Sequence, residues 1–107
     1  MANYLLLYHG GGMPASESEQ KAVLKDWETW FGKLGSNLVD GGNPFNPKAK
    51  SVASDGKVSD GVSAMASGYS IIKADSLDAA AAVARGCPVL KSGAKISVFE
   101  TFNAMGM

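Results

Sequence analysis

The apolar residues near the N-terminus have the two-residue period of a β-strand. Asn3 to His9 is a run of Tyr and Leu that ends at Gly10, Gly11 and Gly12, and this length and ending favour a strand over a buried helix. Successive side chains would point to opposite faces of a sheet, with Tyr4, Leu6 and Tyr8 on one face and Leu5, Leu7 and His9 on the other. Because both sets are largely apolar, we expect a central strand with both faces buried.

The next apolar residues recur every three or four positions, which is the spacing of an amphipathic helix. Ser16 is a good N-cap, and Glu19 three residues later completes a capping box. We therefore predict a helix from about Glu17 to Leu34, ended by Gly35 in a left-handed turn. Its apolar stripe would comprise Val23, Leu24, Trp27, Trp30 or Phe31, and Leu34.

The stretch from Gly68 to Thr101 predicts a strand, a helix and a further strand. Tyr69 to Lys73 is the strand, with Tyr69 and Ile71 on one face and Ser70 and Ile72 on the other. Asp75 or Ser76 would cap a helix that ends at Arg85-Gly86, because Cys87-Pro88 prevents its continuation. The apolar side of this helix would comprise Leu77, Ala80, Ala81 and Ala84. The last strand would contain Ile96, Val98 and Phe99.

The middle of the chain is rich in Gly and Pro and predicts short strands joined by loops. Asn37 to Gly42 indicates a short strand. Lys50 to Ser54 and Lys57 to Ser59 flank Asp55-Gly56, a dipeptide typical of a two-residue type I′ hairpin. The small residues from Asp60 to Ser67 are consistent with a connection or a lip over a pocket.

The order of these elements predicts a single α+β domain over residues 1–107. The predicted order is strand, helix, strand or hairpin, strand, helix, strand. This is the split βαβ, ferredoxin-like arrangement, in which both helices lie on one face of an antiparallel sheet. Two helices cover only one face, whereas the first strand carries apolar side chains on both. We therefore expect a homodimer that pairs the open sheet faces.

The charge balance excludes several classes of partner. Lys plus Arg and Asp plus Glu are ten each, so no overall charge attracts nucleic acid or an anionic membrane. The N-terminal apolar run lacks a basic flank and is too short for a signal peptide or a membrane span, so we expect no targeting segment. Cys87 is the only cysteine, and a reducing cytoplasm is the simplest compartment for it.

His9 is the only histidine and so the most suitable side chain for proton transfer near neutral pH. Asp40 and Asp60 are the candidates to orient it, and a surface or hydrogen-bonded histidine is the alternative. Trp30, Phe45 and Tyr69 are plausible walls of a ligand pocket, with ordinary core packing as the alternative.

Other candidate sites have less support in the sequence. The three glycines at 10–12 are not followed by the Lys-Ser or Lys-Thr pair of a phosphate loop, which favours a connector. Cys87 lies at a helix C-terminus, the wrong end to stabilise a thiolate, which favours buried packing. One His and one Cys give no metal-ligand spacing, so we expect no metal and no cofactor.

The chain resembles the YCII-related family, including its DGPF-domain branch, over nearly its whole length. The resemblance rests on the opening NYLLLYHG, Gly41-Gly42-Asn43-Pro44, Asp60-Gly61, GYSIIKADSLDAAAAVARGCP and the closing KISVFE. It implies a dimeric α+β barrel related to muconolactone isomerase and to small cofactor-free monooxygenase-like proteins. It also implies a pocket between the helices and the sheet or at the dimer interface.

The departures from the family pattern concern the residues of its candidate acid/base pair. That pair is a histidine in the first helix and an aspartate near the Cys-Pro position. Here the first helix has no histidine, and the second position reads Arg85-Gly86-Cys87-Pro88. The DGPF element reads Asp60-Gly61-Val62-Ser63. A catalytic role is therefore not carried over from the family to these positions.

Two functions are consistent with these observations. The first is a small dimeric enzyme that transfers protons on a small aromatic or lactone-like molecule, with His9 as acid/base and Asp40 or Asp60 as its orienter. The second is a non-catalytic ligand-binding or regulatory dimer, which the missing histidine-aspartate pair favours. The family resemblance adds to the second, because family genes often lie beside genes for sigma factors or transporters.

Overall fold

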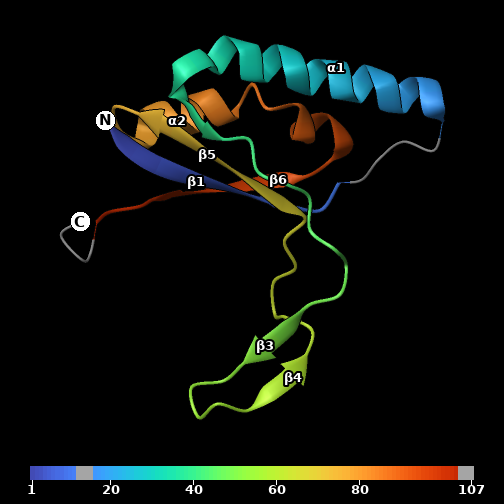
Figure 1. The fold of residues 1–107 in the computed structure, drawn as a ribbon, viewed down its shortest axis with the longest axis vertical. Helices are drawn as coiled ribbons and strands as arrows, with labels where there is room; N and C mark the ends of the chain where they lie inside the picture. Colours follow the sequence, from blue (N-terminus) through green and yellow to red (C-terminus); the bar gives the residue numbers. More distant parts are fainter. Residues whose placement is uncertain (12–15, 104–107) are drawn as a thin grey trace.

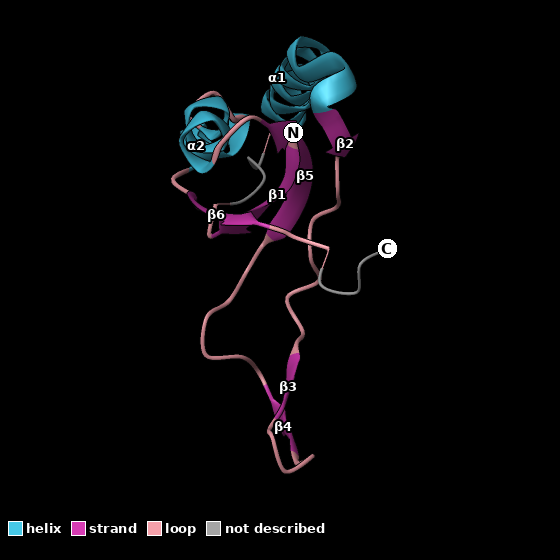
Figure 2. Ribbon diagram, turned by 90° about the vertical axis from the view of Figure 1, so that its left-hand side faces the viewer, coloured by secondary structure: helices cyan, strands magenta, loops and turns pink. Residues whose placement is uncertain are grey.

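The main sheet has four antiparallel strands in the order β2-β5-β1-β6, the order of a ferredoxin-like α+β fold (Figures 1 and 2). The computed structural model describes residues 1–11 and 16–103. Its strands are β1 (Ala2–His9), β2 (Leu38–Asp40), β3 (Lys50–Val52), β4 (Val58–Asp60), β5 (Gly68–Ala74) and β6 (Lys95–Glu100). Its helices are α1 (Glu17–Leu34), α2 (Leu77–Ala84) and the short 3₁₀ helices η1 (Gly35–Asn37) and η2 (Pro88–Ser92). The predicted α+β fold is therefore confirmed.

Both helices lie on the same face of the main sheet (Figure 2). On β1 the side chains that face them are Tyr4, Leu6 and Tyr8, each at most 4% exposed. On β5 the corresponding buried side chains are Ser70, Ile72 and Ala74. The predicted alternation is confirmed, because a strand sends every second side chain toward the same layer.

The opposite face of the sheet is not covered by any described element, and we call it the open face. It carries Leu5 and Leu7 of β1, which are directly opposite Ile71 and Tyr69 of β5. On the other side, Leu5 is opposite Phe99 of β6, which is 52% exposed. In the single chain, β1 is therefore buried fully on the helix side only.

Helix α1 begins and ends where its capping signals predict. The Ser16 side chain accepts a hydrogen bond from the Glu19 backbone N–H, with an N···O distance of 3.2 Å. Gly35 follows Leu34 with a φ of +53° and a ψ of −125°, so φ is positive but ψ lies outside the left-handed helical region. Trp30 is the most buried residue of the helix, and its ring is 5.8 Å from that of Trp27. This aromatic face packs on the sheet.

Helix α2 is capped by Ser76, whose side chain accepts a hydrogen bond from the Ala79 N–H. The buried stripe differs from the predicted one, because Leu77 is 50% exposed and Ala81 is also exposed. Ala80 and Ala84 are buried, and Val83 packs beside them. The prediction was wrong because a helix this short has only two turns, and the sheet selects which of its apolar sides is buried.

Strands β3 and β4 form a separate hairpin that we call the arm, residues 50–60. A hairpin here is confirmed, but the predicted type I′ turn is wrong. That turn needs a positive φ at Asp55, and among the described residues only glycines have one. Gly56 donates to the Ala53 carbonyl and has a φ of +89°, while Ala53 donates to the Lys57 carbonyl. This is the three-residue loop with a glycine bulge.

Candidate functional site

The two segments that lead to and from the arm are attached to one end of the main sheet. The Ser67 N–H donates to the Tyr8 carbonyl at 2.6 Å, and the Phe45 N–H donates to the Ser67 carbonyl at 2.8 Å. Inside, the Tyr8 hydroxyl donates to Ser70 Oγ, which donates to the Gly41 carbonyl. These bonds hold residues 41–45 and 67 beside the last residues of β1. They place His9 next to the base of the arm.

His9 is the last residue of β1 and lies on the open-face side of that strand. Its Nδ1 is 3.1 Å from the Met65 carbonyl, and its Nε2 is 3.1 Å from Ser97 Oγ on β6. A carbonyl oxygen only accepts, so Nδ1 is the donor in this contact. In the form of the ring with one proton, Nε2 is then the acceptor of the Ser97 hydroxyl. The ring is therefore held between a backbone carbonyl and a hydroxyl.

Asp40 lies at the end of β2 and is not the partner of His9. Its Oδ1 accepts from the Gly42 N–H at 2.8 Å, and its Oδ2 accepts from the Tyr69 hydroxyl at 3.3 Å. The Asp40 charge raises the pKa of Tyr69, because it disfavours a second negative charge nearby. Tyr69 therefore stays a neutral hydrogen-bond donor at neutral pH.

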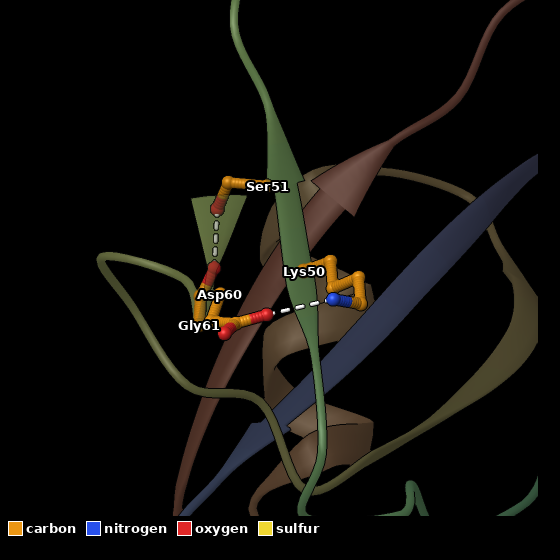
Figure 3. Close-up of polar contacts among 4 residues, drawn as sticks. All are labelled: Lys50, Ser51, Asp60 and Gly61. Atoms are coloured by element: carbon orange, nitrogen blue, oxygen red, sulfur yellow. Dashed lines mark hydrogen bonds and ion pairs between the residues drawn. The ribbon is translucent and has the colours of Figure 1, made fainter. Parts of the chain in front are cut away.

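Asp60 lies on the arm, where it pairs with Lys50 (Figure 3). Asp60 Oδ1 is 2.7 Å from Lys50 Nζ, and the two side chains are 92% and 67% exposed. Beside them, the Ser51 hydroxyl donates to the Gly61 carbonyl at 2.6 Å. Such an exposed ion pair contributes at most about 1 kcal/mol. The structure gives His9, Asp40 and Asp60 three separate sets of hydrogen-bond partners.

The predicted pocket residues are also divided between two places. Phe45 lines an open hollow of about 460 Å³ at the base of the arm, together with Pro44, Asn46, Lys48, Ala49, Val62, Ala64, Met65 and Ala66. The Tyr69 ring stacks on Phe45 with 5.8 Å between ring centroids. Trp30, in contrast, is 6% exposed and belongs to the core on the helix side. Phe45 and Tyr69 therefore lie together, and Trp30 lies on the other side of the sheet.

Met65 connects the hollow to His9, because it lines the hollow and its carbonyl is hydrogen-bonded to the imidazole. Sequence reasoning did not find Met65 or Ser97. A backbone carbonyl leaves no sequence signal, because every residue has one. Ser97 could have been noticed as the one hydroxyl residue of the apolar closing strand, on the face that alternates with Ile96 and Val98.

Cys87 is 3% exposed and packs in the core, and burial raises the pKa of its thiol. Tyr8 beside the same core has its pKa raised by burial as well. A raised native pKa means that the unfolded chain loses its proton first as the pH rises. The buried thiol is therefore a neutral packing group at neutral pH.

Alkaline pH is therefore expected to destabilise the fold through Cys87. The free energy of unfolding should be unaffected by this thiol below its ordinary pKa of 9.0 and fall above it, by up to about 1.4 kcal/mol per pH unit. Urea unfolding at a series of pH values measures this. Cys87→Ala should reduce the decline between pH 9 and the ordinary tyrosine value of 10.0. An identical decline in wild type and variant would contradict the assignment.

The chain matches no family model and no curated protein. Within residues 1–11 and 16–103, no group of three or more His, Cys, Asp or Glu side chains is placed to hold a metal ion. Nor does this part of the chain contain a helix with the length and apolar character needed to cross a membrane. The function must therefore be argued from the geometry around His9.

Proposed function

We propose that the protein is a small homodimeric enzyme that uses His9 as a general acid/base on a small molecule. The observation that carries this proposal is the orientation of the imidazole, with Nδ1–H on the Met65 carbonyl and Nε2 facing Ser97 Oγ. A base held in one tautomer can take a proton from the hydroxyl that its lone pair faces, or from a substrate that displaces this hydroxyl. Met65, rather than Asp40 or Asp60, is the orienting group.

The substrate class follows from the surface next to His9. The hollow at the base of the arm is lined mainly by apolar side chains, and Lys48 is the only charged residue among them. The stacked Phe45 and Tyr69 rings add a flat aromatic surface beside it. A small aromatic or lactone-like molecule suits this lining, with any carboxylate or developing negative charge directed to Lys48.

The homodimer is the assembly that best covers the open face. Leu5, Leu7 and Ile71 are half-buried there in the single chain, and a second copy would bury them fully. Two such sheets packed face to face would make the dimeric α+β barrel that the YCII-related resemblance implies, and the fold is compatible with it. The lone buried thiol of Cys87 suits a reducing compartment, so we place the protein in the cytoplasm.

A non-catalytic ligand-binding or regulatory dimer is the second candidate. It is favoured by the fact that both candidate carboxylates are engaged elsewhere, Asp40 with Tyr69 and Asp60 with Lys50. Without a carboxylate partner, His9 lacks the negative charge that stabilises the imidazolium in a Ser-His-Asp triad. The same hollow would then hold a ligand without changing it.

His9→Ala distinguishes the two functions. A thermal-shift screen of a metabolite library on the wild type identifies binders, and mass spectrometry then measures their turnover. For an enzyme, His9→Ala should lower turnover of a bound compound by about 10²–10⁴-fold. The matched control is Lys95→Ala, because Lys95 is exposed and lies directly opposite His9 in the strand ladder. This variant should convert the bound compound at the wild-type rate. Compounds that bind to the wild type but are not converted by it would support the second candidate instead.

A further inference from the structure

The arm carries two exposed valines that the single chain does not cover. Val52 and Val58 are directly opposite each other in the β3–β4 ladder and are 70% and 60% exposed. Their side chains therefore lie on the same face of the hairpin. A two-stranded hairpin is marginally stable alone in water and normally needs a layer packed against it. The arm is thus an element that lacks its packing partner.

The arm extends past the open face. The helices, the main sheet and the arm follow one another along the longest axis of the molecule (Figures 1 and 2). That axis is 46 Å long. The arm joins the sheet at the end of β1 that holds Tyr8. A second copy seated on the open face would therefore lie beside the arm.

A second exposed apolar group lies at the other end of the sheet. Phe102 is 82% exposed and Met1 is 73% exposed, whereas Phe99, which is 52% exposed, lies further in, opposite Leu5. The Thr101 N–H donates to the Asn3 carbonyl, which holds this end of the chain beside the start of β1. In Figure 1 the arm and this C-terminal stretch are at opposite ends of the strands.

A homodimer brings like surfaces together by a two-fold axis. The two-fold axis of a face-to-face dimer lies between the two sheets. If this axis is perpendicular to the strands, each end of one sheet lies over the opposite end of the partner's sheet. The arm of one copy then meets the end that carries Phe102 of the other copy. An axis along the strands would place both arms at one end and leave Phe102 uncovered.

We propose that the arm is an interprotomer clasp, in which Val52 and Val58 of one copy pack against the partner's Phe102. The inference rests on the homodimer proposed above and specifies its symmetry. By the two-fold symmetry the contact occurs twice. The partner's C-terminal end is then the layer that the hairpin lacks.

The double variant Val52→Thr/Val58→Thr tests the clasp. Threonine keeps the β-branched shape that suits a strand and adds a hydroxyl that is unfavourable in an apolar contact. We expect the dimer dissociation constant, measured by sedimentation equilibrium, to rise about tenfold or more. The matched control is Ser59→Thr, which changes the opposite face of the same hairpin and should leave the constant unchanged.

Phe102→Ala shows whether the two groups touch each other. Alone it should weaken the dimer to a similar extent as the arm variant. Introduced together with the arm variant it should add less than it does alone, because the contact is already lost. Additive effects of the two changes would contradict a direct contact.

A photo-crosslinker at position 58 locates the partner surface. Benzoylphenylalanine in place of Val58 should give a covalent dimer in which residue 58 is joined to the peptide that carries Phe99 and Phe102. If the wild type is a dimer but the crosslinks of the position-58 variant lie elsewhere or within one chain, the clasp is overturned and the dimer is not. If the wild type is a monomer, both the dimer and the clasp are overturned.

Discussion

Replacing Leu5 with lysine is expected to convert the proposed dimer into a monomer with a mass near 11.1 kDa. Leu5 lies in the middle of the open face, directly opposite Ile71 on one side and Phe99 on the other. In a single chain the lysine ammonium reaches solvent, so the fold tolerates it. In a face-to-face dimer the two-fold axis brings two such charges together in an apolar layer, which is strongly unfavourable.

Light scattering at micromolar concentration measures the mass, and unfolding in urea shows whether the variant is still folded. The wild type is expected at twice 11.1 kDa. Leu24→Lys is the matched control, because Leu24 is 52% exposed on α1, on the helix side of the sheet. It should remain dimeric. A Leu5→Lys protein with the wild-type dimer mass would place the interface on another surface.

Among the glycines that the structure describes, Gly42 is the one whose replacement by alanine is expected to reduce stability the most. Gly42 has a φ of +72°, and a Cβ there would overlap the backbone carbonyl oxygen of Tyr69. The left-handed conformation alone costs an L-residue about 1–2 kcal/mol. The overlap with backbone cannot be relieved by a rotamer change, so we expect a total loss of about 3 kcal/mol or more in the free energy of unfolding.

Gly56→Ala separates these two causes. Gly56 also has a positive φ, +89°, but no atom lies within 4 Å of a Cβ added to it. The Gly56→Ala variant should therefore lose only the free energy that the left-handed conformation costs an L-residue, about 1–2 kcal/mol. Urea unfolding of both variants measures the difference. If the two variants lose the same stability, the close approach of residue 42 to β5 is not what requires glycine there.

The extent to which the sequence predicted the fold depended on how local the cause was. The Ser16 side chain and the Gly35 N–H set the bounds of α1 through hydrogen bonds to backbone groups within a few residues of each end. The two faces of β1 follow from the pleat of a strand, which needs no knowledge of its neighbours. These features were predicted correctly because each is decided within one element.

The features that were predicted wrongly depend on contacts between elements or on details of the backbone. Leu77 and Ala81 were predicted to be buried but are exposed. Helix α2 is apolar on several sides, so only the way it packs on the sheet decides which side is buried. Asp55-Gly56 suits more than one turn, and the pairing of Ala53 with Lys57 selects the longer loop.

The candidate site was predicted only in part for the same reason. The sequence singled out His9, the only histidine, and offered Asp40 or Asp60 as the residue that could orient it. The folded chain brings a backbone carbonyl from Met65 and a hydroxyl from Ser97 to the ring. Carbonyls are present at every residue, so which one orients a histidine is known only when the loop is placed.

The sequence by itself determined the order of the main strands and helices, the N-cap of α1 and the two-sided apolar character of β1. These depend on periodicity and on hydrogen bonds between near neighbours, which the order of residues specifies directly. Only the tertiary structure decided that His9 faces Ser97, that Trp30 lies away from Phe45 and Tyr69, and that the arm stands free beside the open face. Each of these depends on side chains and backbone groups far apart in the chain, and their meeting is decided by packing.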